Sequence, residues 1–244
     1  MRVIRLRRPS IFAVSLTVFG VAAFVVLGMW QLRRAQEKEM LLARFARAAH
    51  AQVEPFAVVE RTAPADVYPH VQVHGSFASH RVYLLDNRMH AGQLGVEVFV
   101  PFTPDNRDRT LLVDLGFLPR QGPQEALPEL PPVPRKEVTL RGLYAPPPPP
   151  GLKLGGNPLA HDTSWPKLLT WIDMTAIGTD LRRDLYPRVL LLDADAASPY
   201  VRQWLPDTFP PARHRAYAFQ WFTFALAAVV LFFVLHRKKS PENP

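Results

Sequence analysis

The sequence contains no cysteine among its 244 residues. A chain without cysteine forms no disulfide framework, no CxxC redox pair and no thiolate site for zinc or copper. It also cannot attach haem covalently as c-type cytochromes do. The absence therefore excludes several classes of redox and metal protein, and it leaves the redox compartment undetermined.

The motifs of common enzyme classes are missing as well. There is no GxSxG nucleophile elbow, no phosphate-binding P-loop and no HExxH metal motif. Four aspartates, Asp86, Asp114, Asp193 and Asp195, follow apolar strand-like runs, but no nucleophile accompanies them. Turn formation by aspartate explains this placement better than catalysis. We expect no enzyme; a membrane-tethered enzyme that uses Asp86 or Asp193 is the third of three hypotheses.

Positive charge is present in excess, with a formal net charge of +8. Such an excess can attract nucleic acid. However, much of it flanks two apolar stretches: Arg2, Arg5, Arg7 and Arg8 at one end, and Arg237, Lys238 and Lys239 at the other. Cationic flanks of apolar stretches are retained on the cytoplasmic side of a membrane. The charge therefore predicts the lipid bilayer as a partner, and no nucleic acid.

Two uncharged runs are long enough to cross a bilayer. Residues 11–30 and 216–235 each span 20 residues, which covers a hydrocarbon core of roughly 30 Å as an α-helix. The first is longer than the apolar part of a cleaved signal peptide, and the polar stretch GMWQLRRAQEKE into which it leads contains no A-x-A cleavage pattern. We predict transmembrane helices over 10–30 and 214–235, the first being a retained anchor.

Two spans place both termini on one side of the membrane, and the basic termini favour the cytoplasm. Residues 1–9 and 236–244 are then cytoplasmic. In a bacterial cell the chain lies in the inner membrane, and residues 31–213 form a periplasmic domain.

The segment between the spans is predicted to be rich in β-structure. Its strand candidates are 70–77, 81–88, 95–102, 110–117, 137–144 and 188–195. In GVEVFVPF, Val96, Val98 and Val100 share one face. Residues 167–181 have helical spacing, and the run APPPPPG at 145–151 is a stiff connector. The predicted fold is an α+β membrane protein, with two terminal transmembrane helices flanking an antiparallel sheet or small barrel.

Three histidines cluster in HVQVHGSFASH, and His70 and His74 would face the same side of a strand. A copper or zinc site is one interpretation, but no cysteine or methionine lies nearby. Solvated strand histidines explain the cluster, which includes His80, more simply.

Three segments together resemble the surfeit locus protein one family, the assembly factors of haem–copper cytochrome c oxidase. They are GMWQLRRAQEK at the end of the first span, TLLVDLGFLPR after GVEVFVPF, and HRAYAFQWF at the start of the second span. The resemblance covers nearly the whole chain. One departure is visible: the family often has Asn-Arg before the glycine of the second segment, where this chain has Asp114 and Leu115.

The resemblance implies a role in handling haem A on its way to the catalytic subunit I, with subunit I and haem A synthase as partners. It implies iron ligation by His214, with Tyr217 and Trp221 as matching aromatic positions. The alternative is a membrane scaffold that holds oxidase assembly partners and never touches haem.

The chemistry at the start of the second span is compatible with the haem role. A neutral imidazole can ligate haem iron. His214, Tyr217 and Trp221 fall on one helix face, and Trp30 and Gln31 lie at a similar depth on the first span. Arg213 or Arg215 could pair with haem propionates. The competing interpretation is an ordinary aromatic belt at the membrane surface.

Overall fold

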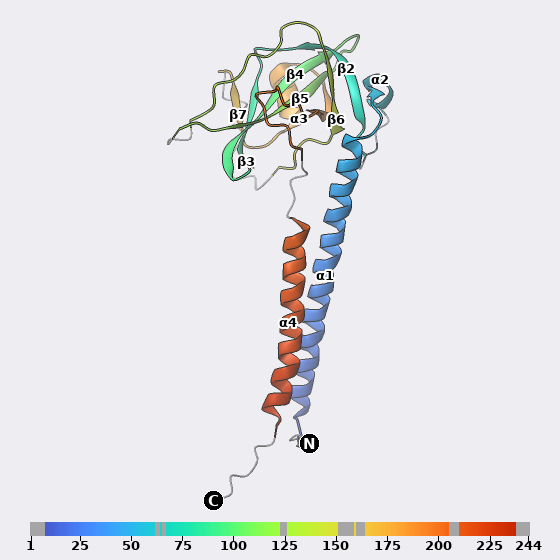
Figure 1. The fold of residues 1–244 in the computed structure, drawn as a ribbon, viewed down its shortest axis with the longest axis vertical. Coiled ribbons are helices and arrows are strands. Elements are labelled where there is room, and N and C mark those ends of the chain that lie inside the picture. The colour runs from blue at the N-terminus through green and yellow to red at the C-terminus, as the bar shows by residue number, and fades with distance from the viewer. Residues whose placement is uncertain are drawn as a thin grey trace, which may run out of the picture. The chain divides into compact units, whose positions relative to one another are not determined.

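The computed structural model describes the chain except for residues 1–7, 62–63, 65–66, 123–125, 151–158, 160–163, 205–209 and 238–244. Most of the basic residues at the two termini, and the last residue of the polyproline run, therefore lie outside the described residues. The chain divides into two units, residues 1–42 with 208–244, and residues 43–207. Figure 1 shows the elements of both units.

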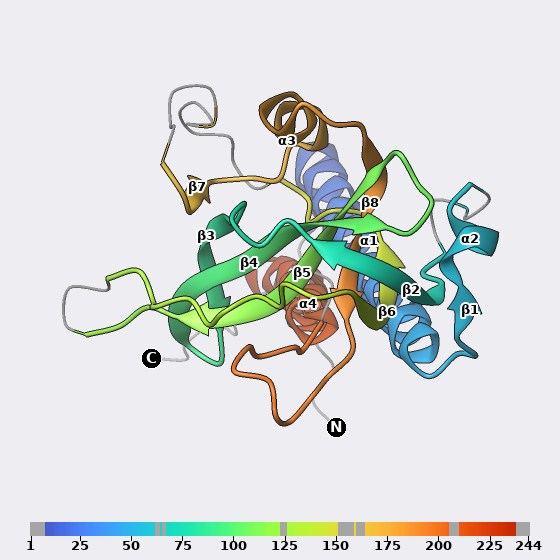
Figure 2. The same cartoon turned by 90° about the horizontal axis from the view of Figure 1, so that it is seen from above.

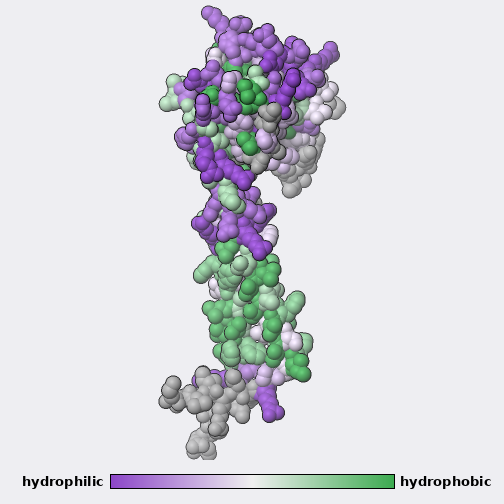
Figure 3. Space-filling model, turned by 90° about the vertical axis from the view of Figure 1, so that its right-hand side faces the viewer, coloured by the Kyte–Doolittle hydropathy of each residue, from purple (hydrophilic) through white to green (hydrophobic). Residues whose placement is uncertain are grey.

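The first unit contains helix α4 (Pro211–Leu235) and helix α1 (Ile11–Ala49) as far as Leu42. Both helices are long and apolar enough to cross a membrane. Figure 3 shows their apolar side chains as a continuous band that gives way to a hydrophilic stretch. Helix α1 continues 19 residues beyond Trp30 because residues 31–49 contain no glycine or proline and are rich in alanine, arginine, leucine and glutamate.

The two helices pack through small residues. Gly28 and Ala35 of α1, and Ala218 and Ala225 of α4, are buried although both helices are otherwise largely exposed. The two positions on each helix are seven residues apart, about two turns, as expected for helices that pack at a shallow angle. A stack of the Phe24 and Trp221 rings, with centroids 5.9 Å apart, adds to this contact.

Gly28 sets how closely the helices approach. A β-carbon at this position would lie 2.7 Å from Cε1 of the Phe222 ring, whereas a β-carbon at Gly20 would meet nothing within 4 Å. A larger side chain at Gly28 must therefore displace Phe222 or separate the helices.

We predict that Gly28→Leu separates the helix pair and that Gly20→Leu does not. Because the chain has no cysteine of its own, a Phe24→Cys/Trp221→Cys pair can report the separation through a short thiol cross-linker. Cross-linking should fall severalfold in Gly28→Leu. Equal yields in the two leucine variants would contradict the prediction.

The second unit is built on one mixed sheet of eight strands. Its elements, in chain order after α1, are β1 (Glu54–Pro55), α2 (Phe56–Val59), β2 (His70–Phe77), β3 (Tyr83–His90), β4 (Gln93–Pro104), β5 (Thr110–Pro119), β6 (Val138–Ala145), β7 (Lys167–Leu169), α3 (Met174–Leu181) and β8 (Leu185–Leu192). All six predicted strands are present, with ends displaced by at most three residues.

Five of the strands close into a barrel (Figure 2). The order is β2-β6-β8-β5-β4, and β2 pairs again with β4 to complete the ring. Closure occurs at Gly75, which is paired with both Val138 and Pro104. A β-carbon there would lie 2.2 Å from the Thr103 carbonyl oxygen, so only glycine permits this approach. The prediction of a small barrel is confirmed.

Two apolar clusters lie on opposite sides of the barrel wall. Val96, Val98 and Val100 point into the barrel with Phe102, which confirms their predicted common face. Outside the wall, Phe45 near the end of α1 joins a second cluster, which includes buried residues of α3 and of β3, β4, β5, β6, β7 and β8.

The helix predicted over 167–181 is wrong in its first half. Lys167–Leu169 form β7 and pair in parallel with Tyr83–Leu85 of β3. The backbone groups at the edge of β3 need partners, and this pairing overrides the helical spacing of the side chains. The helix begins only at Met174, where the Asp173 carboxylate accepts hydrogen bonds from the backbone N–H groups of Thr175 and Ala176.

A buried charge cluster holds α3 against β3 and β7. Asp180 accepts hydrogen bonds from the Tyr83 hydroxyl at 2.7 Å and from Lys167 Nζ at 2.5 Å. The Lys167 side chain is 6% exposed. Burial, and then the bond to Asp180, raise the pKa of Tyr83. Removing the carboxylate would leave a buried cation without its counter-ion.

We therefore predict that Asp180→Ala lowers the free energy of unfolding of this domain by about 3 kcal/mol. Urea denaturation of the detergent-solubilised protein, followed by tryptophan fluorescence, measures the change. Asp184→Ala, at an exposed aspartate of the same region, should cost far less. An Asp180→Ala variant as stable as Asp184→Ala would rule out the energetic role of the cluster.

Candidate functional site

The first turn of α4 places His214 against α1. Its ring atom Nδ1 lies 2.8 Å from the Gln31 side-chain oxygen Oε1. An amide oxygen only accepts hydrogen bonds, so Nδ1 of His214 is the donor and carries the proton. In the neutral imidazole the lone pair then resides on the other nitrogen, Nε2.

The Nε2 atom is the unusual feature of this site. It is buried, and it has no hydrogen-bond partner among the residues that the structure describes. An unpaired buried polar atom costs free energy, and such atoms are rare in folded proteins. Fixing Nδ1–H with an oxygen is the arrangement of a metal-ligating histidine, and a metal reaches the covered Nε2 only when the side chains over it move aside.

Of the other predicted site residues on α4, Trp221 and Tyr217 differ in their surroundings. Trp221 stacks on Phe24 and contacts Phe224 edge-on, with centroids 5.9 Å apart in both pairs. Tyr217 is 48% exposed, so its ring is free to pack against a bound molecule. Ala218, one turn after His214, is 1% exposed, so the helix contact covers it. The structure thus brings Trp221 to the helix contact and leaves Tyr217 on the open side.

On α1, Gln31 and Trp30 do not act together. Gln31 forms a hydrogen bond with His214. Trp30, the residue before Gln31, points about 100° away from it around the helix. Trp30 accordingly is 51% exposed, and its ring packs against the guanidinium of Arg34, 6.0 Å from the ring centroid. Trp30 lies outside the contact that joins Gln31 and His214.

The two arginines beside His214 differ in their surroundings. Arg215 forms an ion pair with Glu39 of α1, so this candidate for a propionate contact already has a carboxylate partner. Arg213 directly precedes His214 and is exposed.

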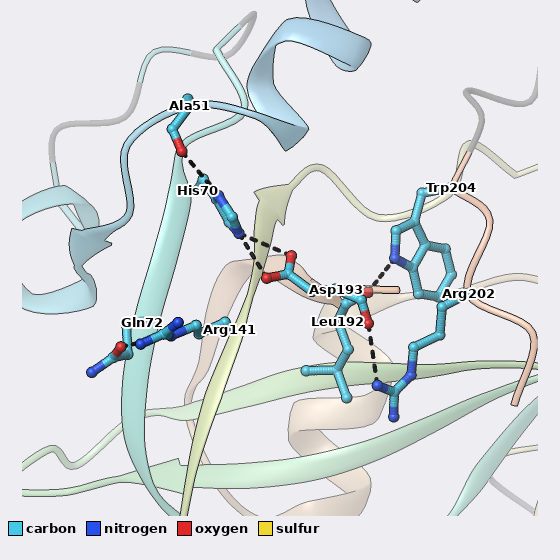
Figure 4. A network of polar contacts seen from close by, with 8 residues as sticks. All are labelled: Ala51, His70, Gln72, Arg141, Leu192, Asp193, Arg202 and Trp204. Carbon is cyan, nitrogen blue, oxygen red and sulfur yellow. Dashed lines mark hydrogen bonds and ion pairs between the residues drawn. The ribbon is translucent and has the colours of Figure 1, made fainter. Parts of the chain in front are cut away.

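A second polar cluster lies in the β domain (Figure 4). His70 is 8% exposed, in contrast to the predicted solvated histidine. Its Nδ1 lies 3.2 Å from the Ala51 carbonyl oxygen, and its Nε2 lies 2.9 Å from both Asp193 carboxylate oxygens. The reason is tertiary: the segment after α1 covers His70, which the strand pattern alone does not show.

The same cluster receives the chain segment that leads toward α4. Arg202 donates to the Asp193 carbonyl oxygen at 3.2 Å, and the Trp204 indole donates to the Leu192 carbonyl oxygen at 2.5 Å (Figure 4). Residues before and after the barrel are therefore both fixed at the end of β8. Among the described residues, no group of three potential metal ligands is present.

His74 and the remaining strand-end aspartates have separate partners. The His74 ring lies 2.5 Å from the Asp105 carboxylate, and this hydrogen bond raises the pKa of His74. Asp86 pairs with Arg120 at 2.6 Å. Asp195 caps a turn as predicted, accepting from the Ala197 N–H at 2.9 Å, and Asp114 makes the equivalent bond with the Gly116 N–H at 3.0 Å. Asp86 and Asp193 instead form ion pairs that the sequence did not reveal.

Asp114 is the most buried carboxyl group of this domain's described part. It is 1% exposed, and its Oδ1 accepts from the Gly116 N–H at 3.0 Å. Burial raises the pKa of Asp114 well above its ordinary range, and the nearby charge of Glu97 raises it further. Gly116 has φ 122°, and a β-carbon there would lie 2.7 Å from the Val201 carbonyl oxygen, so this turn requires glycine.

We predict that Asp114→Asn stabilises the domain increasingly as pH rises. The raised pKa means that folding favours the protonated acid. The stabilisation that the buried Asp114 acid gives the folded domain is therefore complete at pH values below the pKa of the unfolded state. It is lost as pH rises through the raised pKa of the folded state. Thermal denaturation between pH 5 and pH 9 should show the gain over the natural chain growing with pH. Asp108→Asn, at an exposed position, should show no such trend, and a flat Asp114→Asn difference would contradict the assignment.

Comparison with models of known protein families identifies the family of this chain. A model of the SURF1 family matches residues 18–226, which include both sides of the His214–Gln31 contact and the whole barrel. The chain belongs to the SURF1 family. Comparison with individual curated proteins gives no match.

The SURF1 family is known as a family of cytochrome oxidase assembly factors, and it is not known as an enzyme family. Membership confirms the family resemblance of the three sequence segments. It assigns the chain to cytochrome oxidase assembly, and the two apolar helices accord with a membrane protein.

Proposed function

We propose that this SURF1 family member binds haem A as cargo at His214 and assists its insertion into subunit I of cytochrome c oxidase. The observation that carries the proposal is the buried, unpaired Nε2 atom of a histidine whose Nδ1–H is held by Gln31. Haem iron accepts the lone pair of a neutral imidazole.

The residues around His214 have distinct roles in this proposal. Gln31 fixes the ring orientation and keeps the proton on Nδ1. Trp221, stacked on Phe24, supports the helix contact, and the exposed ring of Tyr217 offers an apolar surface to a macrocycle. A single protein ligand suits a carrier, because cargo must also be released.

The proposal includes a location and partners. The chain lies in the bacterial inner membrane with both termini cytoplasmic, as the basic flanks favour. The barrel is then periplasmic, where it meets haem A synthase, the source of the cargo, and subunit I, the recipient.

The decisive experiment is a reduced-minus-oxidised absorption spectrum of the protein purified from cells that make haem A. We expect a haem A signal that His214→Ala abolishes. Gln31→Leu should weaken haem A binding about 10- to 100-fold, because the imidazole loses its orienting partner. Trp30→Leu, on the adjacent residue outside the contact, is the matched control and should bind as the natural chain does. Haem A retained in His214→Ala would overturn the assignment of the ligand.

A scaffold that holds assembly partners without binding haem is the second candidate. Two hollows of about 940 and 850 Å³ on the barrel share Asp108, Asp184 and Tyr186. Exposed arginines line them: Arg61, Arg109, Arg182 and Arg183. Surfaces rich in arginine are typical of protein interfaces. A purified protein free of haem, on which oxidase assembly still depends, would favour this function.

A further inference from the structure

Cationic side chains are concentrated at the end of the helix pair where α4 begins. On the topology proposed above this end is extracytoplasmic, where such side chains are not favoured by the usual distribution of charge. The cations are Arg33, Arg34, Lys38, Arg213 and Arg215, and the anions are Glu37 and Glu39. Figure 3 shows this region as the hydrophilic stretch beside the apolar band. The excess of positive charge calls for an anionic partner.

Both carboxylates are already paired. Glu37 accepts from Arg34 at 2.8 Å, and Glu39 pairs with Arg215. Lys38, by contrast, is partly buried, and no ion pair or hydrogen bond of its side chain is found within the described chain. Arg33 is exposed. Lys38 is therefore the partly buried cation of this group that lacks a counter-ion.

The helix geometry places Lys38 on the face that carries the histidine contact. Lys38 follows Gln31 by seven residues, which is about 700°, or 20° short of two full turns. The rise over seven residues is about 10.5 Å. Arg33 follows Gln31 by two residues and points about 200° away, to the opposite face. Only Lys38 of these two can approach a ligand held at His214.

We propose that Lys38 binds a carboxylate of the molecule held at His214, and so orients a macrocycle with its acidic edge away from the membrane core. This inference rests on the proposed haem site. Haem carries two propionates, and an ammonium group forms short, charge-assisted hydrogen bonds with a carboxylate. Arg213, next to His214 in sequence, adds positive charge on the same side as Tyr217, four residues later.

The test compares haem A with its dimethyl ester, in which both carboxylates are neutralised. Affinities are measured by absorbance titration of the full-length protein in detergent without phospholipid. Lys38→Gln should bind haem A about tenfold more weakly, the loss expected for one hydrogen bond to a charged group. It should bind the ester as tightly as the natural chain does. Arg33→Gln removes the same charge from the opposite face and should change neither affinity.

Other outcomes overturn the inference. An equal loss for haem A and the ester would show that Lys38 acts through the fold. Unchanged affinity for both would show that Lys38 contacts neither carboxylate of the bound molecule. If His214→Ala loses haem A and Lys38→Gln does not, this inference alone fails; if the natural chain binds no haem A, the proposed function fails with it.

Discussion

The close contact between α1 and α4 is the constraint on which the site depends. Gly28, Ala35, Ala218 and Ala225 leave so little side chain between the helices that the short amide of Gln31 reaches His214. In a bilayer apolar side chains gain nothing from meeting one another in place of lipid, so close packing and polar contacts hold helices together. The same hydrogen bond therefore stabilises the helix pair and fixes the imidazole tautomer. The packing of the two helices and the position of the proton on His214 thus depend on one hydrogen bond.

Closure of the barrel limits the number of exposed strand edges. Pairing of β2 with β4 closes the sheet and leaves β1 and β7 as short edges, which limits unwanted pairing with other chains. The end of β8 then anchors the segments that precede and follow the barrel, through Asp193 and the Leu192 carbonyl (Figure 4).

Much of this could be predicted from the sequence, and the failures share a cause. Spans and strands follow from local hydrophobic patterns, which is why all six strands and the face of Val96, Val98 and Val100 were found. The pairing of Gln31 with His214 joins residues 183 positions apart, so a single sequence gives their similar depth and not their hydrogen bond. Burial of His70 and the strand at Lys167–Leu169 likewise arise from distant segments, which override local spacing.

The departure noted in the sequence, at Asp114 and Leu115, has a physical counterpart in the structure. The family resemblance implies asparagine where this chain has Asp114. The raised pKa of Asp114 favours the neutral acid. A neutral carboxylic acid has nearly the shape of the asparagine side chain and, like that side chain, carries one donor group and one acceptor oxygen. The following Leu115 points into the barrel and is 5% exposed, among the apolar side chains of the interior. An arginine would be costly there without a partner. Protonated Asp114 therefore offers the same groups as the asparagine that the resemblance implies, while Leu115 is part of the core.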